Sequence, residues 1–387
     1  MDKYTRLRQL LVERQAQHLY RRPRITEGPQ QPVMQVNGKT MLTFCSNDYL
    51  GLANHPSVIQ AFQQAANQYG VGSGAAHLVN GHSRLHQQLE DALAEFTQRE
   101  RVLLFSTGYM ANLGLTNALA ERHDTVYQDR LNHASLLDAA LLSGAKLVRY
   151  AHNNTEQLGK RLAAQTSGQK IIVTDGVFSM DGDTAPVQDL ATLAHAHDAW
   201  LIVDDAHGFG VLGPTGAGLL ETENLGQEDA ILMGTLGKAL GTSGAFIAGS
   251  TELIEFLIQT ARPYIYTTAQ PPAVAAATLA SLKVLQAETW RREHLHDLIQ
   301  MFRKGATQLG LNLMPSQTAI QPILVGENAK ALAISQQLEQ QGILITAIRP
   351  PTVPVHTARL RITLSAAHTP QQLEVLLSAL DQISRTP

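Results

Sequence analysis

Two stretches of this 387-residue chain carry residue types that could do chemistry together. The apolar run 200–203 ends in Asp204, and His207 follows three residues later. The apolar run 230–234 opens into a Gly-rich turn that carries Lys238. Such runs are typical of buried strands, which present polar groups at their carboxyl ends. An acid and a lysine at two such ends indicate a cofactor that is held from two sides.

Similar short apolar runs recur from residue 101 onward, with mostly helical or turn segments between them. The predicted strands are 102–105, 125–128, 146–150, 170–174, 200–204, 230–234 and 245–248. This alternation predicts an α/β fold with a mostly parallel seven-stranded sheet that is covered on both faces. Ligands of such sheets lie at the carboxyl ends of the strands.

Most of these strand ends carry groups suited to a cofactor. Gly108 and Tyr109 open a helix after the first strand, and its free N–H groups would form an anion site. His133 follows the second strand, and Ser179 follows the fourth. The run 146–150 ends in no group with an assignable role. Each residue alone is more often structural, but their agreement favours a functional site.

The residue types fit pyridoxal 5′-phosphate. A lysine amine forms a Schiff base with an aldehyde. A carboxylate beside a pyridine nitrogen favours the protonated form of that nitrogen, because a nearby negative charge stabilises a positive one. The cationic ring then draws electrons from a bond at the carbon next to the imine. A helix N-terminus with threonine hydroxyls would hold the phosphate.

The chain resembles the α-oxoamine synthase family of fold-type I pyridoxal-phosphate enzymes over nearly its whole length. The motifs that carry the resemblance are SNDYLG at 46–51, GYMAN at 108–112, NHAS at 132–135, DGVFSMDG at 175–182, DDAHG at 204–208, TLGKALG at 235–241 and RLRIT at 359–363. The resemblance implies a large sheet domain, a smaller α+β C-terminal domain, and a homodimer with shared active sites.

The resemblance also implies roles for single residues. It assigns catalytic roles to Lys238, which would carry the cofactor, to Asp204 at the ring nitrogen, and to His133 and His207. The residues implied for cofactor binding are Gly108, Tyr109, His133, Ser179, Asp204, His207, Thr235 and Lys238, with Thr267 or Thr268 of the partner subunit. The residues implied for substrate binding are Arg361 for the amino-acid carboxylate, Arg349 as its assistant, His133, and Asn47, Arg21 and Thr352 near the acyl group.

The implied reaction is a decarboxylative condensation of an amino acid with an acyl thioester. The segment 347–354, AIRPPTVP, resembles the branch that joins L-alanine to pimeloyl-CoA or a pimeloyl carrier protein. Another synthase of the family, such as a glycine C-acetyltransferase, would share every catalytic residue. A non-catalytic subunit on the same fold is a further alternative, but it would have no use for Lys238. Many family members have an arginine after the Gly-rich loop, where this chain has GAAHLV at 74–79, so the role of loop 72–78 stays open.

Two further sequence patterns resemble known binding motifs, but we expect neither to bind the usual ligand of its motif. His82 and His86 have the i, i+4 spacing of a zinc site, but residue 83 is Ser rather than the Glu of a metalloprotease. We therefore expect two surface histidines and no metal. The sequence 208–213 matches G-x-G-x-x-G, but Pro214 and two more glycines follow, which oppose the helix that a dinucleotide site requires.

The composition excludes several classes of protein. Lys and Arg number 30 and Asp and Glu number 33, for a net charge of −3, which gives no reason to expect nucleic acid or an acidic membrane as a partner. Cys45 is the single cysteine and excludes an intrachain disulfide. No apolar run is long enough to span a bilayer, so a soluble, cytoplasmic protein is expected.

The chain is expected to have three parts: an N-terminal segment 1–50, a cofactor-binding domain 51–270, and a linking helix with a small domain, 271–387. The N-terminal segment would hold an amphipathic helix at 4–19 and a β-hairpin at 33–43. A helical pattern runs from Pro271 to about residue 309. The small domain would contain strands at 319–325, 342–348 and 360–364 and helices at 329–340 and 370–383.

Overall fold

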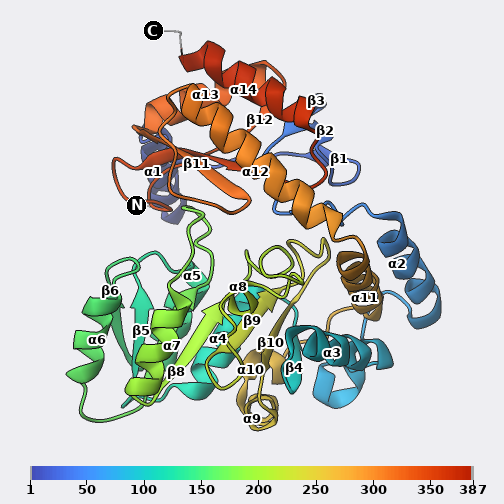
Figure 1. Cartoon of the computed structure of the whole chain (residues 1–387), viewed down its shortest axis with the longest axis vertical. Coiled ribbons are helices and arrows are strands. Elements are labelled where there is room, and N and C mark those ends of the chain that lie inside the picture. The colour runs from blue at the N-terminus through green and yellow to red at the C-terminus, as the bar shows by residue number, and fades with distance from the viewer. Residues whose placement is uncertain (1, 385–387) are drawn as a thin grey trace. The chain divides into compact units, whose positions relative to one another are not determined.

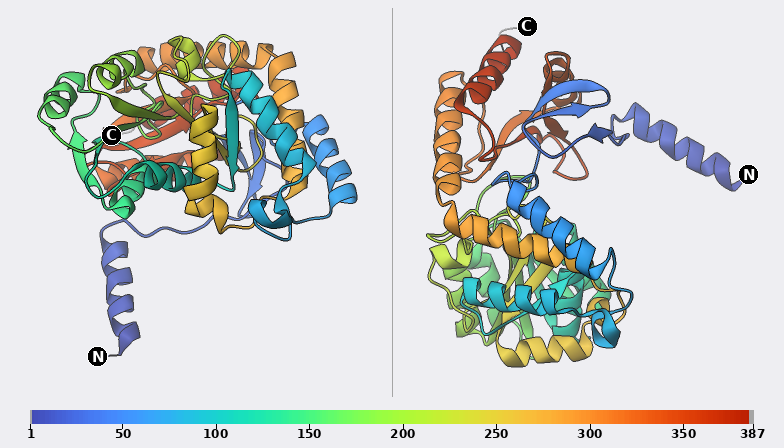
Figure 2. Two further views of the ribbon diagram at one scale, coloured as in Figure 1. Left: turned by 90° about the horizontal axis from the view of Figure 1, so that it is seen from below. Right: turned by 90° about the vertical axis from the view of Figure 1, so that its right-hand side faces the viewer.

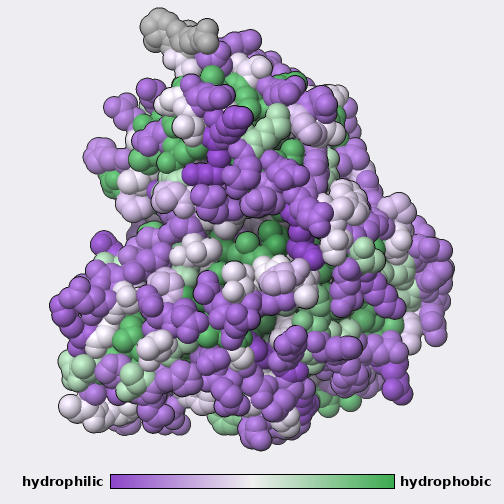
Figure 3. Space-filling view, viewed as in Figure 1, coloured by the Kyte–Doolittle hydropathy of each residue, from purple (hydrophilic) through white to green (hydrophobic). Residues whose placement is uncertain are grey.

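The computed structural model describes residues 2–384, and the chain divides into two compact units (Figure 1). The first unit comprises Met1–Ser46, Met180–Gly182 and His294–Pro387, and the second comprises Asn47–Ser179 and Asp183–Glu293. Among the described residues, no helix is both long enough and apolar enough to cross a membrane. Polar side chains cover much of the face drawn in Figure 3.

A seven-stranded sheet forms the centre of the second unit. Its strands, in spatial order, are β4 (Arg101–Phe105), β10 (Ala245–Gly249), β9 (Ile231–Thr235), β8 (Ala199–Asp204), β7 (Lys170–Asp175), β5 (Thr125–Asp129) and β6 (Lys146–Tyr150). Only β10 runs antiparallel to its neighbours within this sheet. The predicted α/β fold with a mostly parallel seven-stranded sheet is confirmed.

Helices cover the sheet of the second unit and bury its apolar side chains. They are α2 (Pro56–Tyr69), α3 (Arg84–Thr97), α4 (Gly108–Leu119), α5 (Ala134–Ser143), α6 (Thr155–Ala163), α7 (Val187–Ala196), α8 (Leu219–Thr222), α9 (Thr251–Thr260), α10 (Arg262–Ile265) and α11 (Pro272–Ala287), with the turn η1 (His77–Gly81) before α3. In Figures 1 and 2, α11 lies beside α2 and α3. Leu103, Val173 and Ile247 are among the fully buried sheet residues that form the core.

The helical pattern that begins near Pro271 is two helices and not one. α11 ends at Ala287, and α12 (Trp290–Gln308) begins after a break at residues 288–289. Because α11 packs against α2, the second unit extends past residue 270. The segment limits 1–50, 51–270 and 271–387 stay a prediction about domains.

The first unit contains two small sheets. Their strands are β1 (Thr26–Glu27), β2 (Val33–Val36), β3 (Lys39–Thr43) and β12 (Ile343–Leu344) in one sheet, and β11 (Ile320–Gly326), β14 (Ala358–Thr363) and β13 (Thr346–Ile348) in the other. The predicted hairpin is confirmed, with Asn37 and Gly38 at φ 50° and 74° in its turn. The single strand predicted at 342–348 is wrong, because the chain changes sheets at Ile345.

Three helices accompany these sheets and a fourth lies at the N-terminus. They are α12, α13 (Asn328–Gln340), α14 (Pro370–Ser384) and α1 (Lys3–Ala16). The helix predicted at 4–19 thus ends three residues early, and His18 has a positive φ of 58°. No residue of α1 is buried, although Leu7, Leu10 and Leu11 form its apolar side.

Gly241 fixes the turn that carries Lys238, and its replacement by alanine tests this. Its φ is +64°, and an added Cβ would lie 2.3 Å from the backbone nitrogen of Ala53. Backbone strain and the clash together should lower the free energy of unfolding by about 2–4 kcal/mol in Gly241→Ala. Gly144, with φ +75° and ψ 2° and an added Cβ that would meet only a side-chain atom of Arg122 at 3.6 Å, is the matched control and should lose only about 1 kcal/mol. Equal losses in denaturant titrations of the two variants would contradict the steric argument.

Candidate active site

The carboxylate of Asp204 lies at the end of β8 and is held by two donors. Its side chain is buried, with 5% of the residue surface exposed. Asn112 of α4 donates from Nδ2 to Oδ2 over 2.7 Å, and the N–H of Ala206 donates to Oδ1 over 3.0 Å. These two bonds fix the orientation of the buried carboxylate.

His133 is connected to the same network. It is the N-cap of α5, and its backbone N–H donates to Oδ2 of Asp175 over 2.9 Å. Its ring Nδ1 lies 2.8 Å from Oγ of Ser135, which in turn accepts a bond of 2.8 Å from Nδ2 of Asn112. One amide group, that of Asn112, therefore positions both Asp204 and the residue that bonds the His133 ring.

The electrostatics of this pocket favour a bound cation. Asp175 and Asp204 are direct neighbours in the register of β7 and β8. Burial raises the pKa of Asp175 well above its usual range, and the charge of Asp204 adds to this, whereas Lys238 opposes it. Burial also lowers the pKa of His133, which keeps its ring neutral. The buried carboxylate of Asp204 and the neutral ring of His133 suit a protonated pyridine nitrogen better than an anion.

Tyr49 holds His207 in place. The phenol oxygen lies 2.5 Å from Nδ1 of His207, and it is also 3.4 Å from Oδ1 of Asn47. The structure thus brings Asn47 and His207, two of the predicted residues, to either side of one hydroxyl group. Ser179 directly follows Phe178, whose backbone N–H bonds to the carbonyl of Asp183 over 2.9 Å.

The predicted phosphate residues lie at the ends of β4 and β9. Gly108 begins α4, and Oγ1 of Thr107 caps the helix by accepting from the N–H of Met110 over 3.2 Å. The hydroxyl of Tyr109 bonds to Asp138. Thr235 ends β9 and donates to the carbonyl of Gly244 over 3.0 Å. The free N–H groups in the first turn of α4 can donate to a phosphate. The space beside Gly108 is open, because an added Cβ there would meet only one side-chain atom, at 3.5 Å.

Thr267 and Thr268 lie on the segment after α10. Thr268 pairs with Ala76 in an isolated bridge, so this segment is joined to the loop that precedes η1. Among the described residues, no hydrogen bond joins either threonine to Asp204 or Asn112, and the role predicted for them in a partner subunit stays a prediction.

The first unit brings together three of the predicted substrate residues. Arg21 donates from Nη2 to Oγ1 of Thr352 over 3.2 Å, and Arg349 donates to the carbonyl of His18. Burial and the charge of Arg21 lower the pKa of Arg349, whose Nε is buried and has no partner in the described chain. Two guanidinium groups this close favour an anionic ligand.

Arg361 lies on β14 in the same unit and is 7% exposed. Its Nη1 donates to Oγ1 of Thr363 over 3.0 Å. A buried, oriented guanidinium is suited to a carboxylate contact.

Sequence analysis missed the residues that hold the site together. Tyr49, Asn112, Ser135 and Asp175 all lie inside the motifs quoted for the family, but only the structure shows which side chains they bond. His152 was missed because it lies two residues past β6, a strand whose end carried no assignable group.

His152 joins the loops that carry His133 and Ser179. Its Nδ1 lies 3.0 Å from Oδ1 of Asp129, and its Nε2 lies 2.7 Å from Oδ2 of Asp183. Asp129 precedes the His133 loop, and Asp183 closes the Ser179 loop. Burial alone would lower the pKa of His152, but the two carboxylates outweigh it and raise the pKa to about 10.

We expect His152→Gln to lower the free energy of unfolding by about 1–3 kcal/mol at pH 6, since two charged hydrogen bonds are lost. Because the pKa of His152 is raised in the folded state, its protonated ring stabilises the fold fully below the unfolded pKa near 6.5. This stabilisation is lost as the pH rises through about 10. The difference from the unmodified chain should therefore shrink between pH 6.5 and 10. Urea titrations at several pH values measure it, with His195→Gln, which removes a single exposed pair with Asp229, as control. A difference that grows with pH would contradict the assignment of the charge.

The expectation of two surface histidines at 82 and 86 is wrong. His86 has no exposed surface, and His82 is half-buried. The cause is α3, whose first turn faces His77 and the carbonyl of Gln270.

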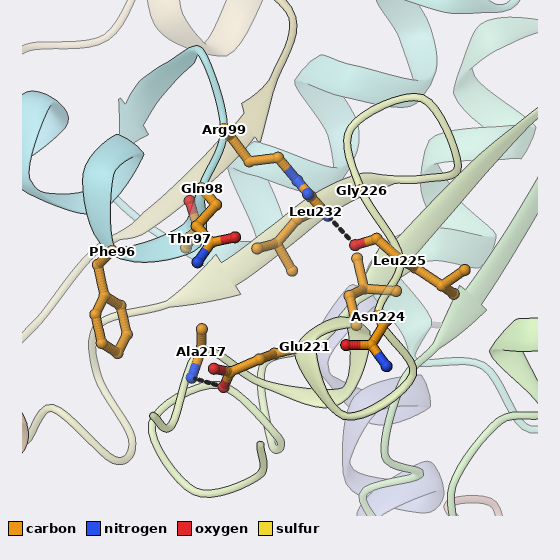
Figure 4. Close-up of a pocket in the computed structure, with 11 residues that line it drawn as sticks. Phe96, Thr97, Gln98, Arg99, Ala217, Glu221, Asn224, Leu225, Gly226 and Leu232 are labelled. Carbon is orange, nitrogen blue, oxygen red and sulfur yellow. Dashed lines mark hydrogen bonds between the residues drawn. The ribbon is translucent and has the colours of Figure 1, made fainter. Parts of the chain in front are cut away.

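A separate cavity lies at the amino end of β9 (Figure 4). Its volume is about 220 Å³, and its lining includes Arg99, Glu221 and Leu232. Arg99 donates to the carbonyl of Leu225 over 3.0 Å. None of the predicted site residues lines it, and it lies at the opposite end of β9 from Thr235.

Comparison with known proteins shows the family of this chain. The family model of aminotransferase class I and II matches residues 39–380. An 8-amino-7-oxononanoate synthase of Pseudomonas entomophila (strain L48) is 61% identical over 371 residues, covering 96% of this chain and 95% of the relative. A structure of SPT with PLP is 31% identical, with a TM-score of 0.94 over 100% of this chain and 99% of the other. An 8-amino-7-oxononanoate synthase from Francisella tularensis is 32% identical, with a TM-score of 0.78 over 89% of this chain and 98% of the other.

The fold and these similarities define a fold-type I transferase that uses pyridoxal 5′-phosphate. The chain belongs to the aminotransferase class I and II family, and within it to the α-oxoamine synthases, close to the 8-amino-7-oxononanoate synthases. The predicted resemblance, enzyme class and cofactor are confirmed.

Proposed function

We propose that this chain catalyses the 8-amino-7-oxononanoate synthase reaction of biotin biosynthesis. L-Alanine and a pimeloyl thioester, of CoA or of a carrier protein, would give 8-amino-7-oxononanoate, carbon dioxide and the free thiol. The observation that carries the proposal is the 61% identity to a synthase of this name over 96% of the chain. The motif AIRPPTVP at 347–354, which contains Arg349 and Thr352, supports the same branch.

When bound, pyridoxal phosphate withdraws electrons from the α-carbon of the amino acid attached to it. Lys238 would hold the cofactor and then act at Nζ as the general base that removes the α-proton of alanine. Asp204, held by Asn112 and Ala206, would keep the ring nitrogen protonated. His133, with its ring fixed through Ser135, would lie against the cofactor ring.

The remaining cofactor residues would orient and anchor the same group. Ser179 and His207, the latter held by Tyr49, would bond the ring hydroxyl. The phosphate would be bound by Gly108, Tyr109 and Thr235, with Thr267 or Thr268 of the partner subunit. This last assignment makes the active enzyme a homodimer.

The arginines would recognise the substrates. Arg361 would bind the carboxylate of alanine, assisted by Arg349. Arg21 and Thr352, which already bond one another, would contact the acyl substrate together with Asn47. Because the similar proteins are bacterial biosynthetic enzymes, we infer that this enzyme works in the cytoplasm.

The test measures thiol release and carbon dioxide formation with each pairing of alanine, glycine or serine with a pimeloyl, acetyl or palmitoyl thioester. We expect alanine with the pimeloyl donor to be preferred over every other pairing. Preference for glycine and an acetyl donor would move the enzyme to a sister activity of the family. Absence of turnover with all pairs, in protein that has bound the cofactor, would favour a non-catalytic subunit.

A further inference from the structure

Three histidine rings converge beside α3. They are His77 in η1, His82 just before α3, and His86 in its first turn. Each offers one nitrogen, and these nitrogens all lie within 4.8 Å of one another. We propose that His77, His82 and His86 bind a divalent transition-metal ion of the zinc type.

The spacing of the rings requires little movement for binding. Nδ1 of His77 lies 2.8 Å from Nδ1 of His82. The ring centroids are 5.1 Å apart for His77 and His82, 5.1 Å for His77 and His86, and 5.6 Å for His82 and His86. Zinc–nitrogen bonds are about 2.0–2.1 Å long, so ligand nitrogens around one ion lie somewhat more than 3 Å apart. The nitrogens now lie within 4.8 Å of one another, so binding would require shifts of about 1–2 Å, which rotations of the His77 and His82 rings would supply.

The protonation states of the rings suit metal binding. A metal requires neutral imidazole, since a protonated ring has no lone pair to offer. Burial is the main cause that lowers the pKa of all three rings, to about 3 for His77. Protons therefore compete weakly for these nitrogens at neutral pH. The carboxyl group of Glu90 lies 3.9 Å from Nε2 of His82. Burial raises the pKa of Glu90 to about 8, so it would balance the charge of an ion only after giving up its proton.

Hydrogen bonds already orient His86 as metal-bound histidines are oriented. Its Nε2 lies 2.8 Å from the carbonyl of Gln270 and donates to it, which leaves the lone pair on Nδ1. That lone pair now accepts the N–H of Ser83 over 2.9 Å. A bound ion would occupy the Nδ1 lone pair of His86 in place of the N–H of Ser83. The proton that now lies between the Nδ1 atoms of His77 and His82 would move to Nε2 of one of these two rings, so that both Nδ1 atoms could bind the ion.

A bound ion would also hold the segment that carries Thr267 and Thr268. His77 stacks on Tyr264 of α10 at 4.8 Å and an interplanar angle of 13°. The carbonyl of Gln270, which bonds His86, also accepts from Oγ of Ser73 over 2.6 Å. Fixing the three histidines therefore fixes residues 262–270 against α3.

The experiment is a zinc titration of the full-length holoenzyme without a histidine tag, against a chromophoric chelator. We expect one zinc ion per chain, with affinity reduced about 100-fold or more in His77→Gln and in His82→Gln. His195→Gln, which changes an exposed histidine elsewhere, should bind as the unmodified chain does. Any zinc bound by the cofactor is common to all four proteins and drops out of the comparison. Equal affinity in all four proteins would overturn the proposal.

Cobalt absorbance provides a second measurement, which does not depend on the variants folding. The unmodified chain with Co²⁺ should show the strong visible bands of a four-coordinate site with nitrogen ligands. In thermal unfolding, zinc should raise the midpoint of the unmodified chain and of His195→Gln, but not that of His82→Gln. Only the weak bands of hydrated cobalt, with no shift in the midpoint, would refute a site at these residues.

Discussion

Lys238→Ala should abolish the covalent attachment of the cofactor and reduce turnover by at least about 10³-fold. The lysine would perform two tasks, because it carries the cofactor and then removes the α-proton, a step for which a positioned base contributes about 10²–10⁴-fold. Borohydride reduction followed by peptide mass spectrometry measures the first task. The unmodified chain should carry the reduced cofactor on the peptide that contains Lys238.

The matched control is Lys160→Ala. Lys160 lies on the exposed surface of α6 and pairs with Glu156 one turn earlier, so its loss should leave turnover unchanged. If Lys238→Ala still carried a reduced cofactor on a lysine, or turned over within tenfold of the unmodified chain, Lys238 would not be the residue that attaches it.

Asp204→Asn should lower kcat/KM by about 10²–10⁴-fold while leaving the fold intact. The amide has nearly the shape of the carboxylate, but it carries no charge to keep the ring nitrogen protonated. Its single oxygen can accept from only one of the two donors, Asn112 and Ala206, that now bond Asp204. We therefore expect a chain that is folded but about 1–2 kcal/mol less stable without the cofactor, and much less active with it.

Steady-state kinetics and urea titrations of the cofactor-free chain measure the two effects separately. Asp91→Asn is the control, because Asp91 is exposed on α3 and accepts only from Gln87 one turn earlier. The kcat/KM of Asn112→Ala should lie between those of Asp204→Asn and Asp91→Asn. This variant keeps the charge of Asp204 but lacks the donor that orients its carboxylate. Full activity in Asp204→Asn would mean that another group protonates the ring.

The sequence predicts the positions of polar groups along the chain better than their partners. The sheet was predictable because its strands are short apolar runs separated by helical or turn segments, and the hairpin because Asn37-Gly38 adopts the left-handed backbone that its turn requires. Asp204, His133 and Lys238 could be predicted as candidates because strand ends of a parallel sheet meet at one edge. Tyr49 and Asn112 could not, since a hydrogen bond between distant segments leaves no local pattern.

The burial of single side chains could not be predicted from residue spacing either. His82 and His86 share the period of a helix face, but that period is the same on an exposed face and on a buried one. His152 lay past a strand end that matched no known chemistry, because its partners, Asp129 and Asp183, come from two other loops. The strand expected at 342–348 failed for a related reason, as continuous apolar character does not reveal a change of sheet at Ile345.

Helix α1 has a consequence for how the N-terminus behaves in solution. A helix of 14 residues is marginal in water by itself, and most helical stability in proteins comes from packing of an apolar face. Because no residue of α1 is buried within the chain, its Leu7, Leu10 and Leu11 side chains provide none of that packing in a single subunit. Packing within the chain therefore stabilises residues 3–16 little, and in dilute protein their amide hydrogens should exchange nearly as fast as those of an unfolded peptide.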